Sequence, residues 1–214
     1  MRLNNLDRNS RLRESEIVRP KTRLALIKII NKAIKEQGYC CDLNFIDTSL
    51  VTDMLKLFAN SKFNGDISQW NVSNVKDMGG MFYNSKFNGD ISNWDVANVE
   101  NMCDMFAGSA FNGDISDWNV SNVEGMNNMF YDSVFNQDIS DWDVSNVKYM
   151  ANMFADSKFN QDVSNWNISN AKDTEDMFYD TNIKDEYKPQ LKTNESRSLT
   201  ESRNRISSNL RRFI

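Results

Sequence analysis

The feature that most constrains this chain is an internal repeat with a period of 24 residues. One tryptophan column and two phenylalanine columns keep this spacing throughout. The tryptophans are Trp70, Trp94, Trp118, Trp142 and Trp166, and the phenylalanines are Phe63, Phe87, Phe111, Phe135 and Phe159 in one column and Phe58, Phe82, Phe106, Phe130, Phe154 and Phe178 in the other. The consensus reads F-N-G-D-I-S-x-W-N-V-S-N-V-x-x-M-x-x-M-F-x-x-S-x. Such a period is typical of solenoids, in which each copy stacks only on its neighbours.

Six copies of the repeat are recognisable, and the first and last match the consensus least well. Tyr39 to Leu43 aligns weakly with Phe63 to Ile67, and Ala171 and Thr174 replace the usual valine and methionine. Weakened end copies are expected where stacking stops. The copies run over residues 39–62, 63–86, 87–110, 111–134, 135–158 and 159–182.

Each copy contains two local signals. Residues 66–68 are short and extended in character, which predicts a strand. Val75, Met78, Met81 and Phe82 have the spacing of one face of a short helix. The sequence therefore predicts an α/β solenoid, a leucine-rich-repeat-like right-handed coil with a short parallel strand and a short helix per repeat.

An asparagine column precedes the predicted helices. Asn74 is followed three residues later by Asp77, a spacing that resembles a capping box and predicts a helix N-cap. The column consists of Asn74, Asn98, Asn122, Asn146 and Asn170. The tryptophan column is expected in the core, although stacked indoles could also form a platform for bases or sugars.

A second polar column is acidic, and its members are Asp42, Asp66, Asp90, Asp114, Asp138 and Asp162. Carboxylates stacked one repeat apart repel each other, by about 3 kcal/mol per pair at an effective dielectric near 20. Backbone N–H donors in Asx-turns would offset this repulsion, and the turn residues before Asp66 favour that interpretation. Calcium binding by Asp66, Asp90, Asp114, Asp138 and Asp162 is the weaker alternative, because the usual calcium-loop patterns are missing.

One position varies between an otherwise constant serine and tryptophan. Its residues are Gln69, Asn93, Asp117, Asp141 and Asn165, which we call the variable column. If Ile67 points inward, the variable column lies on an exposed surface of the kind that repeat proteins use for binding. A generic solvated surface is an equally good interpretation.

Catalysis finds no support in the sequence, and no catalytic residue, cofactor or small-molecule substrate is expected. The chain has no histidine, which removes Ser-His-Asp and Cys-His catalysis and the commonest zinc ligand. Its three cysteines include the adjacent Cys40 and Cys41, and we expect all three to be reduced. Cys103 falls in a variable position of the predicted helix and is expected to be exposed.

Charge divides the chain into three parts. Residues 1–36 carry ten Lys/Arg against four Asp/Glu, residues 37–183 carry seven against 22, and residues 184–214 carry eight against four. The first part contains a flexible basic tail, residues 1–21, and a predicted capping helix, residues 22–38, with Leu24, Ile27, Ile30 and Ile34 toward the first coil.

Residues 183–214 are expected to form a linker and a basic amphipathic helix that begins near Ser198. Docking on a partner or on this chain, binding a membrane surface, binding nucleic acid and an inert tail all remain open for this helix. Nucleic acid fits poorly with the acidic middle part. The expected docking residues are Leu199, Ile206, Leu210, Phe213, Arg211 and Arg212.

The consensus F-N-x-D-I-S-x-W-[DN]-V-S-N-V, followed by M-x-x-M-F, resembles the repeat of BspA-family leucine-rich-repeat surface proteins. The resemblance runs in register from Tyr39 to Asn182, and residues 20–38 resemble the helical cap that leads into such repeats. It implies a bacterial surface or secreted protein that adheres to other proteins. No signal peptide or lipidation cysteine is evident near Met1, so the residues alone favour a cytoplasmic location.

Two hypotheses of function follow. The first is a non-enzymatic protein-interaction or adhesion-type module that presents a rigid acidic surface to an unknown protein partner. The second is a structural or assembly component, which the basic terminal segments dock onto a larger complex, particle or membrane surface.

Overall fold

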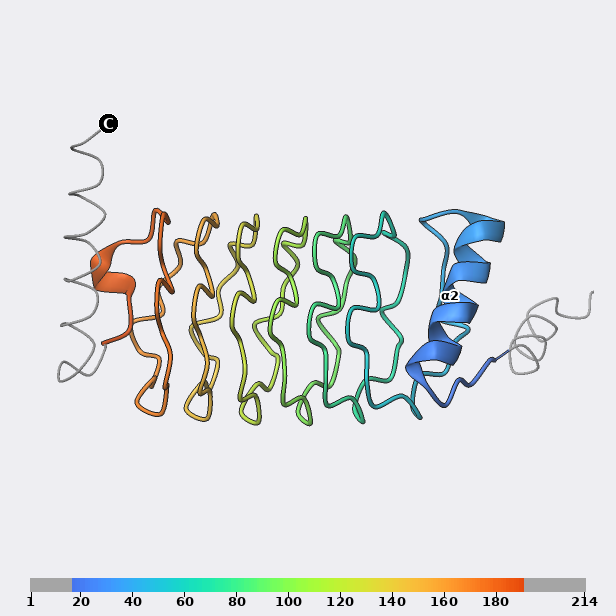
Figure 1. The fold of residues 1–214 in the computed structure, drawn as a ribbon, viewed down its shortest axis with the longest axis horizontal. Coiled ribbons are helices and arrows are strands. Elements are labelled where there is room, and N and C mark those ends of the chain that lie inside the picture. Colours follow the sequence, from blue (N-terminus) through green and yellow to red (C-terminus); the bar gives the residue numbers. More distant parts are fainter. Residues whose placement is uncertain (1–16, 191–214) are drawn as a thin grey trace, which may run out of the picture.

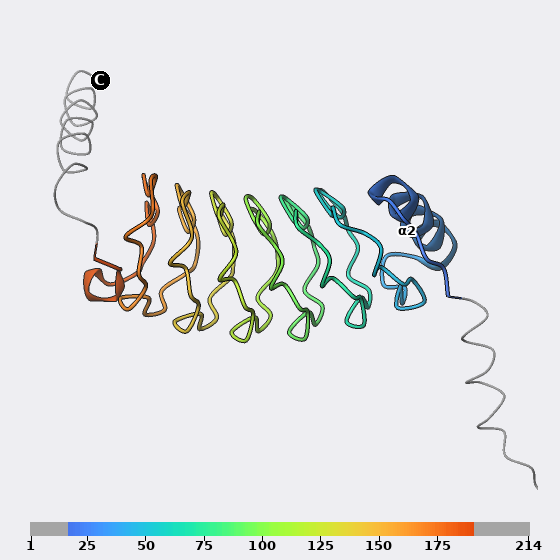
Figure 2. The ribbon, with the colours of Figure 1, turned by 90° about the horizontal axis from the view of Figure 1, so that it is seen from below.

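The computed structural model describes residues 17–190. The chain winds into a row of coils, one per 24-residue copy, which stack side by side (Figure 1). Helix α2 (Arg23–Gln37) lies at one end of the row and the 3-10 helix η1 (Asp185–Tyr187) at the other. Figure 2 shows the same order of coils from below. Among the described residues, strand pairing is limited to isolated parallel bridges.

Neighbouring coils are joined by a ladder of backbone hydrogen bonds in the second half of each copy. The donors Met78, Gly80, Phe82 and Asn84 reach the carbonyls of residues 101, 103, 105 and 107 in the next coil, over 2.9, 2.8, 2.9 and 2.7 Å. Parallel bridges mark the ladder at Asp53–Asp77, Asp77–Asn101, Asn101–Gly125, Gly125–Tyr149 and Tyr149–Asp173. These four donors of each coil point toward the carboxyl-terminal end of the stack, whereas flanking N–H groups such as those of Lys76 and Lys86 donate back to the Thr52 and Ser61 carbonyls of the preceding coil.

The segment that carries this ladder was expected to be the helix of each repeat, and it is instead a series of tight turns. The N–H groups of Met81, Tyr83 and Ser85 donate to the carbonyls three residues earlier, at 3.0–3.1 Å. Gly80 and Asn84, each the third residue of a turn, have φ angles of 57° and 48°. A positive φ cannot occur within a right-handed helix, so each turn ends after one step.

Two columns in this segment have a positive φ in every coil. They contain Lys56, Gly80, Asp104, Asn128, Asn152 and Asp176, and Asn60, Asn84, Gly108, Asp132, Asp156 and Asp180. Glycine, asparagine and aspartate tolerate this backbone best. The turns still bring Met78, Met81 and Phe82 to the core, which is why a helical spacing of apolar residues was visible in the sequence.

Among the described residues, the segment expected to be a strand forms a backbone bridge between coils at the start of the stack, where Asp42 pairs with Asp66, and a single backbone hydrogen bond at its end, from Val163 to Tyr187. In the next described coils, side chains make the connection instead. The Asn64 Oδ1 accepts from the Asn88 N–H at 2.8 Å. The same contact recurs between the successive pairs Asn88–Asn112, Asn112–Asn136 and Asn136–Asn160. The backbone itself turns here, because the Trp70 N–H donates to the Ile67 carbonyl at 3.1 Å.

The asparagine column does not cap helices, so the predicted N-cap role of these residues is wrong. Each side-chain amide donates to a backbone carbonyl of the preceding coil. The pairs are Asn74–Ser49, Asn98–Ser73, Asn122–Ala97, Asn146–Ser121 and Asn170–Ser145, at 2.7–2.9 Å. A capping asparagine accepts a hydrogen bond within its own helix, whereas these asparagines donate between coils.

The core is a continuous column of stacked aromatic rings. The Phe58, Phe82, Phe106, Phe130, Phe154 and Phe178 ring centroids follow one another at 5.5–5.7 Å. The five tryptophans are 3–4 % exposed and lie against this column, as Trp94 does against Phe82. Each indole N–H donates to a carbonyl 27 residues earlier, at 3.0–3.2 Å. No buried side-chain polar atom of residues 17–190 lacks a hydrogen-bond partner.

Helix α2 begins after Thr22, whose Oγ1 accepts from the Ala25 N–H at 3.3 Å, and ends at Gly38, where φ is 88°. Both residues are the boundaries that the sequence indicated. The buried face consists of Leu26, Ile30 and Ala33.

Of the four residues expected to face the first coil, Ile30 is buried and Ile27 and Ile34 are partly buried against the core, whereas Leu24 is 68 % exposed and Leu26 is buried instead. Leu26 has a helical spacing to Ile30 as good as that of Leu24 to Ile27, and contact with the first coil selects it. The Arg23 guanidinium donates to the Leu55 carbonyl at 2.6 Å, so it covers part of the carbonyl edge at this end.

At the other end, residues 183–190 cover part of the last coil. Ile183 is buried, and the Tyr187 carbonyl accepts from the Val163 N–H at 2.9 Å. The N–H groups of the last ladder donors, Thr174, Asp176, Phe178 and Asp180, have no acceptor within residues 17–190. The expected C-terminal helix and its docking residues lie outside the described residues, as does the basic tail up to residue 16.

Candidate binding surface

The coil has two long sides that face away from each other across the core. One side carries the Asp column and the variable column, and the other carries the ladder. Trp70 points inward from the first side and its ring centroid lies 5.8 Å from that of Phe58, which points inward from the second. Each side therefore presents its remaining positions to solvent.

The Asp column is held in Asx-turns, as the sequence interpretation favoured. The Oδ1 of Asp66, Asp90, Asp114, Asp138 and Asp162 each accepts the N–H of the serine two residues later, at 2.9–3.0 Å. Asp42 makes the same contact with the Asn44 N–H at 2.8 Å. A donor fixed in the backbone at every step stabilises the charged form of these stacked carboxylates.

The serine N–H donors also lower the pKa of Asp66, Asp90, Asp114 and Asp162 below the ordinary value. For Asp90 the neighbouring carboxylates of Asp66 and Asp114 act in the opposite direction, and more weakly. This part of the surface is therefore negatively charged at neutral pH. Among residues 17–190, no three acidic or cysteine side chains come close enough together to ligate one metal ion.

The variable column is exposed in every coil. Its residues Asp117 and Asp141 add two carboxylates beside the Asp column. At the ends of the column the side chains and backbone take part in contacts between coils: the Gln69 N–H donates to Asn44 Oδ1 at 2.9 Å, and Asn165 Nδ2 donates to the Ser140 carbonyl at 3.2 Å. The central members are thus the ones that are available to a partner.

Two shallow depressions lie along this side. One, of about 300 Å³, is lined by Asp114, Ser116, Gln137, Asp138, Ser140 and Asp141, and it brings one predicted binding residue together with two members of the Asp column. The floor of this depression is polar. A small molecule is usually bound in a more enclosed and more apolar pocket, so this shape suits a macromolecular surface better.

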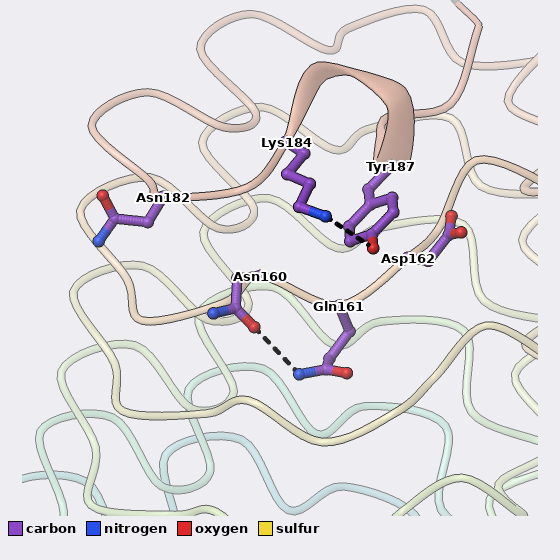
Figure 3. A pocket seen from close by; sticks show the side chains of 6 residues that line it. All are labelled: Asn160, Gln161, Asp162, Asn182, Lys184 and Tyr187. Atoms are coloured by element: carbon purple, nitrogen blue, oxygen red, sulfur yellow. Dashed lines mark hydrogen bonds between the residues drawn. The ribbon is translucent and has the colours of Figure 1, made fainter.

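The second depression, of about 390 Å³, lies at the last coil and is lined by Asn160, Gln161, Asp162, Asn182, Lys184 and Tyr187 (Figure 3). Lys184 Nζ donates to the Tyr187 hydroxyl at 3.1 Å and lies 4.6 Å from the ring centroid. This contact raises the pKa of Lys184. The ammonium group of Lys184 thus lies against the Tyr187 side chain, which lines the same depression.

The cysteines are free thiols. Cys103 was expected to be exposed and is half-buried, because its position belongs to the ladder and not to a helix surface. Burial raises the pKa of its thiol, which makes the reactive thiolate less abundant.

One set of exposed residues on the ladder side was not predicted from the sequence. Tyr83, Tyr131 and Tyr179 occupy the same position in alternate coils and are 42 %, 39 % and 59 % exposed. Alanines stand between them at positions 107 and 155, and another precedes them at position 59. This alternation over 48 residues was visible in the sequence, but the 24-residue period concealed it.

Within residues 17–190 no helix has the length and hydrophobicity that a membrane span requires. Among curated proteins and solved structures, none matches the chain. The family described as "Mycoplasma protein of unknown function, DUF285" matches residues 30–134 and 110–208, which together span most of the chain and all six repeats. The chain belongs to this DUF285 repeat family.

Proposed function

We propose that this protein is a non-enzymatic interaction module, a solenoid of the leucine-rich-repeat class that presents a rigid acidic surface to another protein. The observation that carries the proposal is the pairing of the Asp column with the variable column on one side of the stack. The resemblance of the repeat to BspA-family surface proteins supports an adhesion-type role.

The acidic surface is fixed before any partner arrives. Each carboxylate of the Asp column accepts a hydrogen bond from its own turn, as Asp114 does from the Ser116 N–H, and the turns lie against the aromatic core through the neighbouring tryptophans, such as Trp118. A preorganised surface loses little conformational entropy on binding, which favours affinity. The variable column then provides positions that differ from coil to coil, as recognition of one particular partner requires.

The charge of this surface indicates the chemistry of the partner. Neither the Asp column nor the variable column contains a lysine or arginine, and the variable column adds the carboxylates of Asp117 and Asp141. Aspartates are ionised at neutral pH, and the hydrogen bonds that lower the pKa of Asp66, Asp90, Asp114 and Asp162 favour the same charged form. A basic protein surface fits best, and complementary charge would also accelerate association.

Two pairs of substitutions test the proposal with equal changes of charge. In the first pair, Asp117→Asn and Asp141→Asn, the new residue already stands in the same column at positions 93 and 165. In the control pair, Asp95→Asn and Asp143→Asn, the new residue already stands in that column at positions 71, 119 and 167. Both double variants should fold as the parent does.

Each variant would be cross-linked in source cells, and the proteins attached to it would be quantified. We expect the first pair to reduce a specific cross-linked partner at least about tenfold, with little change for the control pair. An equal loss from both pairs would indicate non-specific attraction, and no loss from either would reject the surface.

The same assay distinguishes the assembly hypothesis. That hypothesis is favoured by the division of charge, since residues 184–214 carry eight Lys/Arg against four Asp/Glu. A chain that ends after Gln190 retains every described coil and removes the rest of this basic segment. An interaction module should keep its partner after this truncation, whereas a component docked by its basic end should lose it.

A further inference from the structure

The tyrosines on the ladder side are not required by the fold. Alanine occupies their position in coils that have the same hydrogen bonds, and Ala107 and Ala155 are 1 % exposed between the tyrosines. Tyr83, Tyr131 and Tyr179 leave about half of each side chain in water. Among residues 17–190, the contacts between aromatic rings join phenylalanines and tryptophans, such as Phe58 with Phe82 and Trp142 with Trp166. None of them involves one of these three tyrosine rings. We call these three residues the tyrosine row.

The tyrosine row has a fixed spacing. Its carbonyls are ladder acceptors, from Asn60 to Tyr83, Gly108 to Tyr131 and Asp156 to Tyr179, at 2.7–2.9 Å. Adjacent hydrogen-bonded segments lie about 4.8 Å apart, so tyrosines in alternate coils repeat about every 10 Å. The row therefore offers three flat apolar surfaces at regular intervals along the stack.

The surroundings of the row are acidic, although the fold does not require acidic residues there. The two positive-φ columns contain five aspartates, Asp104, Asp132, Asp156, Asp176 and Asp180, against one lysine. Asparagine and glycine serve the same backbone positions in other coils, so aspartate adds charge and no conformational advantage. The Tyr131 hydroxyl is hydrogen-bonded to the Asp156 carboxylate, which also raises the pKa of Tyr131.

A tyrosine ring with a carboxylate beside it matches a lysine or arginine side chain. The cation lies on the ring face and pairs with the carboxylate at the same time. A polyproline II chain rises about 3.1 Å per residue and has three residues per turn, so every third side chain points the same way about 9 Å further on. This repeat is within about 1 Å of the row's spacing, a difference that long cationic side chains can absorb.

We infer that the ladder side binds an extended cationic polypeptide, with a lysine or arginine at every third residue lying on Tyr83, Tyr131 and Tyr179. The surface is separate from the Asp and variable columns, which face the other way across the core. If the ladder side does not bind such a peptide, the proposed function of the Asp and variable columns is unaffected. If those columns bind no partner, the inference for the ladder side is likewise unaffected. A peptide of seven residues is enough to span the row.

The test uses the full chain and two peptides of identical composition. In Arg-Pro-Pro-Arg-Pro-Pro-Arg the cations have the spacing of the row, and in Arg-Arg-Arg-Pro-Pro-Pro-Pro they are adjacent. We expect the spaced peptide to bind at least about tenfold more tightly by calorimetry or fluorescence anisotropy, because only it reaches all three rings. Equal affinities would show that net charge alone attracts the peptide, which would overturn the inference.

Variants locate the binding on the row. Tyr83→Ala, Tyr131→Ala and Tyr179→Ala together should remove the preference for the spaced peptide, while Tyr149→Ala, a 42 % exposed tyrosine outside the row, should preserve it. Asp132→Asn, Asp156→Asn and Asp180→Asn should weaken the spaced peptide at least about tenfold and reduce its salt dependence. Because alanine and asparagine are natural at these positions in other coils, circular dichroism should show the parent fold.

Two further outcomes would overturn the inference. A preference for the spaced peptide that survives the triple tyrosine variant would place the binding elsewhere. Binding of neutral cellohexaose, lost in the tyrosine variant and without any binding of the spaced peptide, would assign the row to glycans.

Discussion

The Nε1 of Trp118 donates a hydrogen bond to the carbonyl oxygen of Ile91, 3.1 Å away in the preceding coil. Trp118 is 3 % exposed and Ile91 is 1 % exposed, so no water replaces this contact. One side chain thus fills the core of its own coil and satisfies the backbone of its neighbour.

Replacing Trp118 with phenylalanine should lower the free energy of unfolding by about 1–3 kcal/mol, because it removes a buried hydrogen bond and leaves a gap in the core, although the Ile91 carbonyl still accepts from the Trp94 N–H. Urea denaturation of the full chain would measure the change. Tyr149→Phe removes a polar group from an exposed aromatic side chain, and it should change stability by less than about 0.5 kcal/mol.

The positive-φ columns make a prediction about glycine. Gly108 has a φ of 65°, and a Cβ added there would lie 3.7 Å from the Asn84 Cα, which is an ordinary contact. Gly108→Ala should therefore destabilise the chain through backbone strain alone, by about 1–2 kcal/mol. Gly108→Asn should cost less, since Asn84 holds the same conformation one coil earlier. Equal thermal stability of the alanine and asparagine variants would contradict the turn assignment.

The asparagine column can be tested with one substitution that separates two roles. If Asn122 were a helix N-cap, aspartate would replace it without loss. Because its side-chain amide donates to the Ala97 carbonyl at 2.7 Å, Asn122→Asp instead brings a carboxylate to an acceptor. We expect the aspartate variant to be less stable than the parent by about 1 kcal/mol or more in urea denaturation. A variant as stable as the parent would restore the capping interpretation.

The Asp column gives stability a dependence on pH. Hydrogen bonds from Ser92 and Ser116 lower the pKa of Asp90 and Asp114 in the folded chain. The unfolded chain therefore binds protons more readily, near the ordinary pKa of about 3.9. The contribution is present above that pH and is lost as the pH falls through the lower folded values.

Comparison of urea midpoints at pH 6 and pH 3 would measure this effect. Asp90→Asn together with Asp114→Asn should reduce the pH dependence, because asparagine forms the same turn and does not titrate. Asn71, which accepts the Ser73 N–H at 3.1 Å, shows that asparagine serves in such a turn in this chain. A double variant with the parent's pH dependence would mean that other groups are responsible.

The buried positions could be predicted well from the sequence, because they recur with the same 24-residue period as the repeat. Phe82, Trp94 and Met105 were placed by their period alone, and all of them are buried. The local backbone was harder to predict. Met78, Met81 and Phe82 have a helical spacing, but successive turns return to the core at the same intervals. Gly80 and Asn84 are the residues that distinguish a series of turns from a helix, because both residue types tolerate a positive φ. This signal becomes clear only when the same positions are compared in all coils.

The binding surface was predicted only in part. The exposure of Asp117 and Asp141 followed from the inward direction of the neighbouring Ile115 and Ile139. The role of Asn74 could not be separated from capping, because both roles require a small amide near a turn. The tyrosine row could not be predicted, because its exposure depends on the direction in which each side chain of the ladder segment points. A helix, which the sequence predicted for that segment, points its side chains in other directions than the observed turns do.

The central N–H donors of the ladder all point toward the carboxyl-terminal end of the stack, so the two ends of the stack differ chemically. The carbonyl edge meets Arg23, whereas the N–H edge ends at Thr174, Asp176, Phe178 and Asp180 without an acceptor in the described chain. Between these ends, one coil is related to the next by the same rotation and translation, so the fold has no preferred length. Loss or duplication of one 24-residue unit would leave both ends chemically unchanged. Relatives of different lengths are therefore expected to differ by whole 24-residue repeats.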